Sequence, residues 1–154
     1  MLSTGTSATR STRTSPRTRR ARRVVAAALA VSGLAVVGPV TAADAATPRN
    51  GVCESGEVCF YYLSNYQGSL SDFTSSVSTY GTDPATCYVF KTRGLSGYNA
   101  CIKNNVQSVW NRSTRAVRVY YNSNYSGASQ LIPANSYTNL NTSLRDNNAS
   151  HKFL

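Results

Sequence analysis

Few side chains in this 154-residue sequence have types and spacing suited to catalysis. The only histidine, His151, stands in a segment typical of a final strand, where we expect it at the rim of the fold without a nucleophile as partner. The segment Gly94-Leu95-Ser96-Gly97 lacks the glycine spacing of a nucleophile elbow. Five carboxylates stand mostly beside turn residues and show no paired spacing: Glu54, Glu57, Asp72, Asp83 and Asp146. The sequence therefore predicts no catalytic residue and no enzyme.

Four cysteines offer the other reactive groups: Cys53, Cys59, Cys87 and Cys101. An even number of cysteines in a small exported domain is typical of a disulfide framework. Of the three pairings that four cysteines allow, the sequential one is favoured, because each bridge then closes a loop within one half of the chain. The chain has no Cys-x-x-Cys and a single histidine, which argues against a zinc site.

The N-terminal 45 residues have the pattern of an export signal. Seven arginines precede Val24, an apolar run follows to Val40, and Ala43-Asp44-Ala45 supplies small residues for cleavage after Ala45. A membrane anchor is the alternative, but glycine and proline interrupt the run, which falls short of the ~20 residues of a span. We expect a secreted, extracellular protein, and the general secretory and twin-arginine routes both stay open.

Cleavage changes the charge of the chain. Seven of the 16 Lys and Arg residues and one of the six acids lie in the signal, so the net charge of +10 falls to about +4. Arg112, Arg115 and Arg118 beside Trp110 form a small basic cluster, without the extent of a phosphate track. We expect one small domain that is monomeric, binds no nucleic acid and, after cleavage, no membrane.

An internal repeat organises the exported part. The octapeptide at residues 61–68 returns at 120–127 with six of eight positions identical. Such self-similarity is typical of a duplicated structural unit. We expect a short leader at 46–52, then a domain at 53–154 with one repeat at about 53–111 and the other at about 115–154.

The composition between turn residues is typical of strands. Eight alternating or apolar segments are bounded by Gly, Asn, Pro or Ser: 58–62, 69–73, 87–91, 106–111, 116–121, 128–132, 137–140 and 149–154. No window keeps a helical apolar stripe, so helix is limited to a turn or two near Asp72–Tyr80. The prediction is an all-β antiparallel sandwich of two four-stranded sets.

Each repeat begins with two tyrosines and a glycine at one spacing: Tyr61, Tyr66 and Gly68, then Tyr120, Tyr125 and Gly127. A tight hairpin needs a residue at positive φ, which glycine adopts at little cost, and the aromatic rings can fold over its back. We expect the later serines, Ser108 and Ser150, to hold each hairpin by hydrogen bonds.

This double pattern resembles the Greek-key motif of the βγ-crystallins. The resemblance implies a calcium site in each of two polar segments, formed by Asn104, Asn105 and Ser108 and by Asp146, Asn147 and Ser150. Both segments lack the final serine of the family pattern, and Asp146 is their only carboxylate. A solvated polar loop that caps a hairpin is therefore favoured over a working calcium site. No cofactor is required, and any calcium affinity is expected to be millimolar.

The opening Cys53-Glu54-Ser55-Gly56-Glu57-Val58-Cys59 is similar to that of the secreted streptomycete metalloproteinase inhibitors, with Cys-x-x-Gly-x-x-Cys before a Greek-key body. The resemblance implies an inhibitor of an extracellular peptidase, most simply a metallopeptidase. The family's reactive bond lies in a disulfide loop of the second repeat. Because this chain has no cysteine after Cys101, no reactive residue transfers to it.

The insert at 88–100 is the candidate inhibitory loop, since a disulfide-pinned loop can hold an extended, pre-ordered backbone with an anchor side chain. Its candidate anchors are Phe90, Lys91, Arg93, Leu95 and Tyr98. An ordinary stapled connection is the alternative. The alternative function is a calcium-binding structural or envelope module whose ten tyrosines serve polysaccharide binding.

Overall fold

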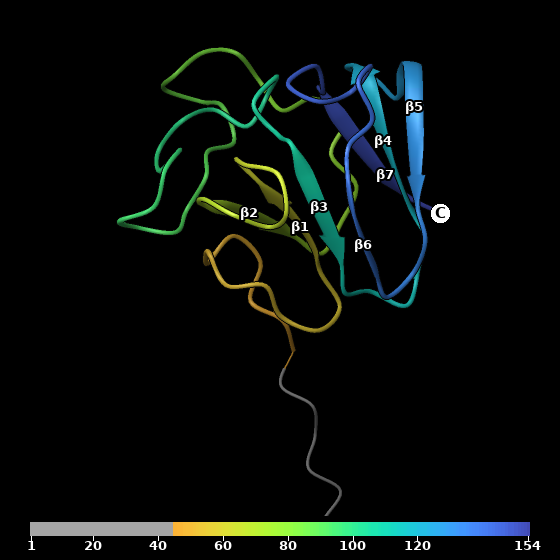
Figure 1. Ribbon diagram of the computed structural model, residues 1–154, viewed down its shortest axis with the longest axis horizontal. Coiled ribbons are helices and arrows are strands. Elements are labelled where there is room, and N and C mark those ends of the chain that lie inside the picture. Colours follow the sequence, from red (N-terminus) through yellow and green to blue (C-terminus); the bar gives the residue numbers. More distant parts are fainter. Residues whose placement is uncertain (1–44) are drawn as a thin grey trace, which may run out of the picture. The chain divides into compact units, whose positions relative to one another are not determined.

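The computed structural model describes residues 45–154, so the predicted signal peptide lies outside the described residues apart from Ala45. The described chain is all-β, with no α-helix among these residues. Its strands are β1 (Val58–Tyr61), β2 (Leu70–Phe73), β3 (Ser108–Asn111), β4 (Val117–Asn122), β5 (Ser126–Ile132), β6 (Ser136–Asn139) and β7 (Ser150–Phe153). They form one sheet in the order β2-β1-β3-β6 and another in the order β5-β4-β7 (Figure 1).

The two repeats exchange their third strands. In the first repeat, β1 pairs with β2 and β3; in the second, β4 pairs with β5 and β7, and every pairing is antiparallel. The third strand of the second repeat, β6, joins the first sheet beside β3. Reciprocally, Val77 of the first repeat bridges His151 of β7. This is the Greek-key sandwich that the repeat and the strand pattern predict.

Two local predictions were wrong. Residues 87–91 form no strand, because Val89 makes only an isolated bridge with Cys101 on its own return segment. The turn of helix near Asp72–Tyr80 is absent, since β2 continues to Phe73 and the chain then runs alongside β7. The segment beside β7, residues 75–79, is an eighth extended segment besides the seven strands. Its sequence does not indicate a strand, because only Val77 in this Ser-rich stretch is apolar and buried.

Both hairpins fold as the repeat suggests. The rings of Tyr61 and Tyr66 meet at 5.9 Å, and those of Tyr120 and Tyr125 also at 5.9 Å. Gly68 and Gly127 have φ of 77° and 79°. The tyrosines before them, with their neighbouring asparagines, adopt positive φ as well, which is unfavourable for a bulky residue and needs support from the surrounding structure.

That support comes from two serines. The Ser108 hydroxyl donates to Leu63 O at 2.7 Å and accepts from Tyr66 N at 3.0 Å. The Ser150 hydroxyl makes the matching pair of bonds, to Asn122 O at 2.6 Å and from Tyr125 N at 3.2 Å. Each serine therefore closes the hairpin of its own repeat across a distance of 25 to 45 residues in sequence.

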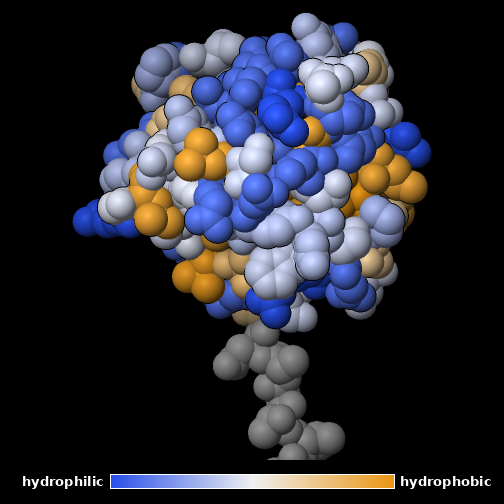
Figure 2. All heavy atoms as spheres, viewed as in Figure 1, coloured by the Kyte–Doolittle hydropathy of each residue, from blue (hydrophilic) through white to orange (hydrophobic). Residues whose placement is uncertain are grey.

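The main apolar core lies between the sheets and is built from inward residues of the strands with Tyr80, Phe90, Ile102, Leu140 and Leu144. A smaller, separate buried cluster contains Cys59, Tyr61 and Leu70. On the outside, Figure 2 shows apolar residues in small separate groups among polar ones on the viewed face. Within residues 45–154, no helix has the length and apolar character needed to cross a bilayer.

Candidate functional site

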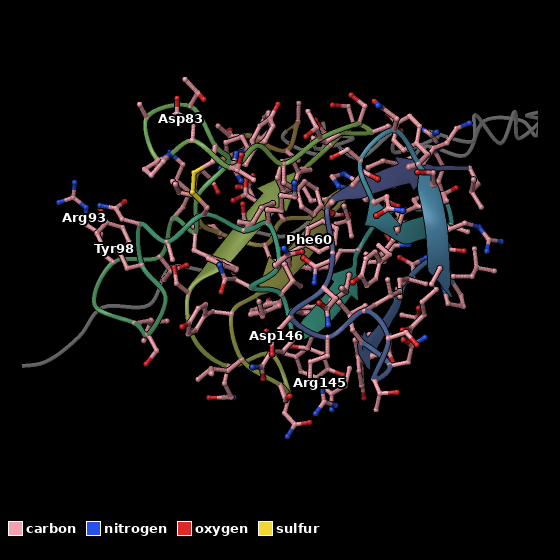
Figure 3. All side chains as sticks on the ribbon, turned by 90° about the horizontal axis from the view of Figure 1, so that it is seen from above. Phe60, Asp83, Arg93, Tyr98, Arg145 and Asp146 are labelled. Atoms are coloured by element: carbon pink, nitrogen blue, oxygen red, sulfur yellow. A yellow bond between two sulfur atoms is a disulfide. The ribbon has the colours of Figure 1, made fainter. Side chains whose placement is uncertain are left out.

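The candidate loop is a pinned, irregular hairpin. A disulfide joins Cys87 to Cys101, and another joins Cys53 to Cys59, which is the sequential pairing favoured from the sequence. Above the Cys87–Cys101 bridge, Phe90 N donates to Ala100 O and Asn99 N donates to Phe90 O, both at 3.0 Å. Figures 1 and 3 place this loop at the end of the domain opposite β5.

The loop is also bonded to the edge of the first sheet. Lys91 N donates to Leu70 O at 2.7 Å, and Ser69 N donates to Ser96 O at 2.8 Å. Beneath the tip, Gly97 lies against the ring of Tyr62, where an added Cβ would stand 2.2 Å from a ring carbon. Backbone bonds and packing thus fix the tip relative to β2.

The short leader supports the base of the loop, a role that its sequence does not suggest. The Arg49 guanidinium donates to Val89 O at 2.9 Å and to the Ser71 hydroxyl, and it lies 4.5 Å from the centre of the Phe73 ring. Burial lowers the pKa of Arg49 from its ordinary value. The Asp72 carboxylate accepts from the backbone of the next two leader residues, at 2.9 and 2.8 Å.

Four of the five candidate anchors lie on the exposed tip: Lys91, Arg93, Leu95 and Tyr98. Figure 3 shows Arg93 and Tyr98 at the far end of the loop, with the guanidinium 6.0 Å from the centre of the ring. Phe90 as an anchor was wrong. It is fully buried and packs edge-on against Tyr62 at 5.5 Å, because the chain turns inward beside the bridge.

The expectation of an extended tip was also wrong. Turns occupy most of residues 93–99, and Gly94, Gly97 and Asn99 have positive φ of 77°, 87° and 63°. Three left-handed residues in six bend the backbone repeatedly, whereas an extended strand keeps φ negative throughout. The tip is a compact knob with projecting side chains.

The two segments predicted to bind calcium lie side by side. Asn104 N donates to Asn148 O at 2.8 Å, and Asp146 N donates to Val106 O at 3.1 Å. Three of their side-chain oxygens are already engaged: Asp146 Oδ2 accepts from the Gln107 amide at 3.1 Å, and both serine hydroxyls hold hairpins. The described residues contain no group of three His, Cys, Asp or Glu side chains placed to hold a metal.

These residues fit calcium poorly, since one carboxylate supplies little ligand charge and the basic residues Lys103 and Arg145 adjoin the two segments. We therefore expect a millimolar dissociation constant by titration calorimetry. At 1 mM calcium such a site adds about 0.4 kcal/mol to the free energy of unfolding, a small shift by scanning calorimetry. Asp146→Asn is the matched control. Micromolar affinity that disappears in this variant contradicts the expectation.

His151 is buried in the core rather than at the rim, so that prediction was wrong. Its ring packs against Phe60 and Phe73, each at 4.9 Å between ring centres. One ring nitrogen lies 2.9 Å from Ser75 O, a pure acceptor, which assigns the proton to Nε2 and leaves Nδ1 to accept from the Tyr80 hydroxyl at 3.2 Å. Burial lowers the pKa of His151 to about 3.

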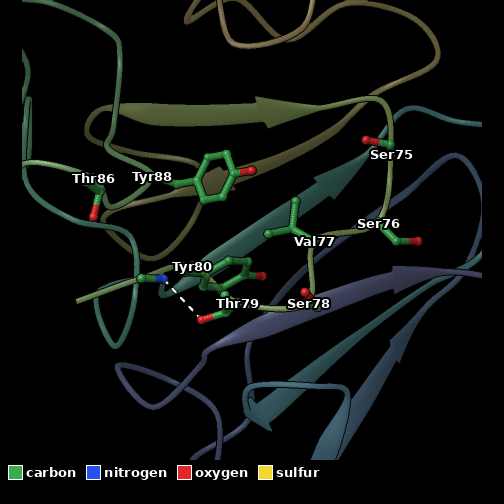
Figure 4. Close-up of a pocket in the computed structure, with 9 residues that line it drawn as sticks. Ser75, Ser76, Val77, Ser78, Thr79, Tyr80, Thr86 and Tyr88 are labelled. Atoms are coloured by element: carbon green, nitrogen blue, oxygen red, sulfur yellow. Dashed lines mark hydrogen bonds between the residues drawn. The ribbon is translucent and has the colours of Figure 1, made fainter. Parts of the chain in front are cut away.

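A hydroxyl-rich pocket lies beside His151, between segment 75–81 and Thr86 and Tyr88 (Figure 4). Its serines cannot use the imidazole as a base, because both ring nitrogens are already bonded to Ser75 O and the Tyr80 hydroxyl. A serine nucleophile is therefore not formed here.

The three arginines of the predicted basic cluster contact different neighbours. Arg112 stacks on Trp110 at 4.8 Å, Arg115 lies over Phe153 at 5.0 Å, and Arg118 donates to the Ser129 hydroxyl. Each guanidinium covers a different neighbour, which is an ordinary use of arginine on a protein surface.

A model of peptidase inhibitor family I36 matches residues 46–132, more than half of the chain, and the protein belongs to this family. It is thus a peptidase inhibitor and not an enzyme, and its partner is a peptidase. The family and the two disulfides accord with an extracellular protein. A comparison with curated proteins gives no match.

Several solved structures are similar to this chain. One, described as "Evolution of the eye lens beta-gamma-crystallin domain fold", shares 22% identity over 65% of this chain and 86% of its own, with a TM-score of 0.48. A βγ-crystallin from Ciona intestinalis shares 16% over 64% and 100%, with a TM-score of 0.46. A βγ-crystallin from an archaeon shares 16% over 66% and 100%, also with a TM-score of 0.46.

Proposed function

We propose that this protein is secreted through its N-terminal signal, inhibits metallopeptidases, and uses the Cys87–Cys101 loop to fill the active-site cleft. The observation that carries the proposal is a projecting tip held on both sides, by its disulfide and by backbone bonds to β2. The choice of metallopeptidases is supported by the opening Cys53–Cys59 heptapeptide, which is similar to that of secreted metalloproteinase inhibitors.

Rigidity is what makes this loop suited to inhibition. A flexible peptide loses conformational entropy when it is ordered in a cleft. The free-energy cost is about 0.5–1.5 kcal/mol for each immobilised side chain, and ordering the backbone adds to it. Here the loop backbone is ordered in the free protein, with Phe90 buried below the tip and Gly97 against Tyr62. Binding then orders only the exposed side chains.

The loop acts by occlusion and not by capturing the enzyme's metal. Residues 88–100 contain no His, Cys, Asp or Glu, the usual zinc ligands. The turn-rich tip also lacks the extended backbone of a bound substrate strand. We therefore expect a plug whose peptide bonds stay intact during inhibition.

The exposed side chains offer two kinds of anchor. Leu95, with 48% of its surface exposed, suits a peptidase with an apolar specificity pocket, such as a thermolysin-like enzyme. Lys91 and Arg93 suit a pocket with a carboxylate, as in trypsin-like enzymes. We propose that the apolar side chain, Leu95, is the anchor. Replacing Leu95 is therefore expected to weaken inhibition of the zinc enzyme, whereas replacing a basic residue of the loop is not.

The test measures inhibition constants of the secreted chain against a thermolysin-like zinc peptidase and a trypsin-like serine peptidase. Leu95→Ala is expected to weaken inhibition of the zinc enzyme ~10-fold to 100-fold, as removal of an interface anchor does. Leu131→Ala, on β5 at the opposite end and 45% exposed, is the matched control and leaves inhibition unchanged.

Replacing both loop cysteines, Cys87→Ser with Cys101→Ser, tests the loop as a whole. We expect a loss of inhibition larger than that of Leu95→Ala, with circular dichroism showing that the sheets remain. Unchanged inhibition in this double variant excludes the loop. Inhibition of the serine enzyme alone, lost in Arg93→Ala, assigns the loop to the other class of target.

A further inference from the structure

An aromatic pocket lies on the outer face of the first sheet. Four rings line it: Tyr61 from β1, Tyr66 from the hairpin, Trp110 from β3 and Tyr137 from β6. The rings of Tyr66 and Tyr137 meet edge-on at 4.9 Å. Tyr137 is 65% exposed and is therefore accessible to a ligand.

The second repeat shows that the fold does not require this pocket. Its hairpin keeps the tyrosine pair, but Lys152 replaces Trp110 two residues after the serine that closes the hairpin. The bridge of Val77 with His151 places Ser76 opposite Lys152, where the first sheet has Tyr137 opposite Trp110. Trp110 and Tyr137 are therefore additions to a scaffold that closes without them.

A polar pocket adjoins the aromatic one and shares Trp110 with it. Its other lining residues are Ser55, Arg112 and Asn135. The Arg112 guanidinium stacks on the Trp110 ring at 4.8 Å and donates one N–H to Cys53 O, which leaves further donors for a ligand. Among the described residues, Arg112 is the one charged side chain that lines these two pockets, so this face favours a ligand that carries negative charge.

The surroundings of these pockets favour a sugar over a peptide added as a further strand. The backbones of β1 and β3 are paired on both sides, and only β6, which carries Tyr137, is an edge strand. A peptide added as a strand is held by unpaired backbone groups at such an edge and not by the face of the sheet. The face offers rings, a hydroxyl, an amide and a guanidinium instead, which match the apolar ring faces and hydroxyl groups of sugars.

We propose that this face binds an acidic saccharide. One sugar ring lies against the exposed ring of Tyr137 and the partly exposed ring of Trp110, and the carboxylate of a neighbouring unit accepts hydrogen bonds from Arg112. Arginine and carboxylate groups suit one another because guanidinium donors match the two carboxylate oxygens. The site is separate from peptidase inhibition and does not rest on it.

Binding at this face can be followed by tryptophan fluorescence, because Trp110 is the single tryptophan of the chain. The secreted protein is titrated with an oligogalacturonate trimer while tryptophan emission is recorded, with a neutral cellotriose as the comparison sugar. We expect a saturable change in emission with the acidic trimer and binding at least ~10-fold weaker for the neutral one. Arg112→Gln is expected to remove that preference.

Tyr137→Ala is the principal variant, because Tyr137 is the most exposed of the four rings of the pocket. We expect it to weaken binding at least ~10-fold, while Tyr121→Ala, whose ring is 44% exposed outside the pocket, binds like the unmodified chain. Inhibition of the peptidase stays unchanged in Tyr137→Ala.

Three outcomes overturn the proposal. The first is an emission that does not change with either sugar, and the second is binding that is equal in Tyr137→Ala and Tyr121→Ala. The third is a dimer in analytical ultracentrifugation that Tyr137→Ala dissociates, which assigns the face to a second copy of the chain.

Discussion

Lowering the pH from 7 to 4 is expected to reduce the free energy of unfolding by about 3 kcal/mol through His151 alone. The pKa of His151 is about 3 in the folded protein, against an ordinary value of 6.5. The cause is first the burial of the imidazole among aromatic rings, with a smaller contribution from the positive charge of Arg49, while the hydrogen bond to Ser75 opposes both.

The sign follows from which state takes up the proton. Between pH 6.5 and pH 3 the unfolded chain binds a proton at His151 and the folded chain does not, so acid favours unfolding. The stability is complete above pH 6.5 and is lost as the pH falls toward 3. Within residues 45–154, no carboxylate is among the groups that shift the pKa of the ring. Its neighbours are Tyr80, whose pKa burial raises well above 10, and three phenylalanines.

Urea unfolding at several pH values measures this dependence, and His151→Gln isolates the contribution of the histidine. Glutamine does not titrate, so the variant starts less stable at pH 7 and loses less stability on acidification. The carboxylates contribute equally to both proteins. If both curves fall in parallel between pH 7 and pH 4, His151 is not the group responsible.

Removing the serine hydroxyls that close the hairpins is expected to cost roughly 1 to 3 kcal/mol each in the free energy of unfolding. Ser108→Ala leaves Leu63 O and Tyr66 N without their partner, and Ser150→Ala does the same in the second repeat. Each also releases a tyrosine from an unfavourable positive φ of 61° or 58°.

Denaturant unfolding measures both variants, with Ser126→Ala as control because its exposed hydroxyl bonds only to Ser123 O at the hairpin tip. The control is expected within about 0.5 kcal/mol of the unmodified chain. Equal losses in Ser108→Ala and Ser150→Ala follow from their matching bonds. A loss no larger than that of the control in either variant shows that water replaces the hydroxyl there.

The sequence was informative where local pattern and repetition determine structure. The tyrosine and glycine spacing placed both hairpins, and the alternating or apolar segments between turn residues located the seven strands of the described chain within a few residues. It failed for Val77, since one apolar residue among serines shows no period, although β7 requires that segment as its neighbour.

The site depended more on contacts between distant residues. Phe90 and His151 were expected near the surface, but the first packs on Tyr62 and the second on Phe60, contacts that no local pattern indicates. The docking of Arg49 beneath the loop was likewise hidden, because its partners come from β2 and from the loop itself. The pairing of the cysteines could be predicted from the sequence, because each bridge closes a short segment.

The exchange of third strands links the two repeats by more than contact. If one repeat existed as a separate protein with the same pairings, it could complete its sheet only by exchanging its third strand with a second molecule, as in a domain-swapped dimer. Joining the copies in one polypeptide makes the trade intramolecular and independent of protein concentration. Such an exchange suits a peptidase inhibitor that must stay folded when it is dilute.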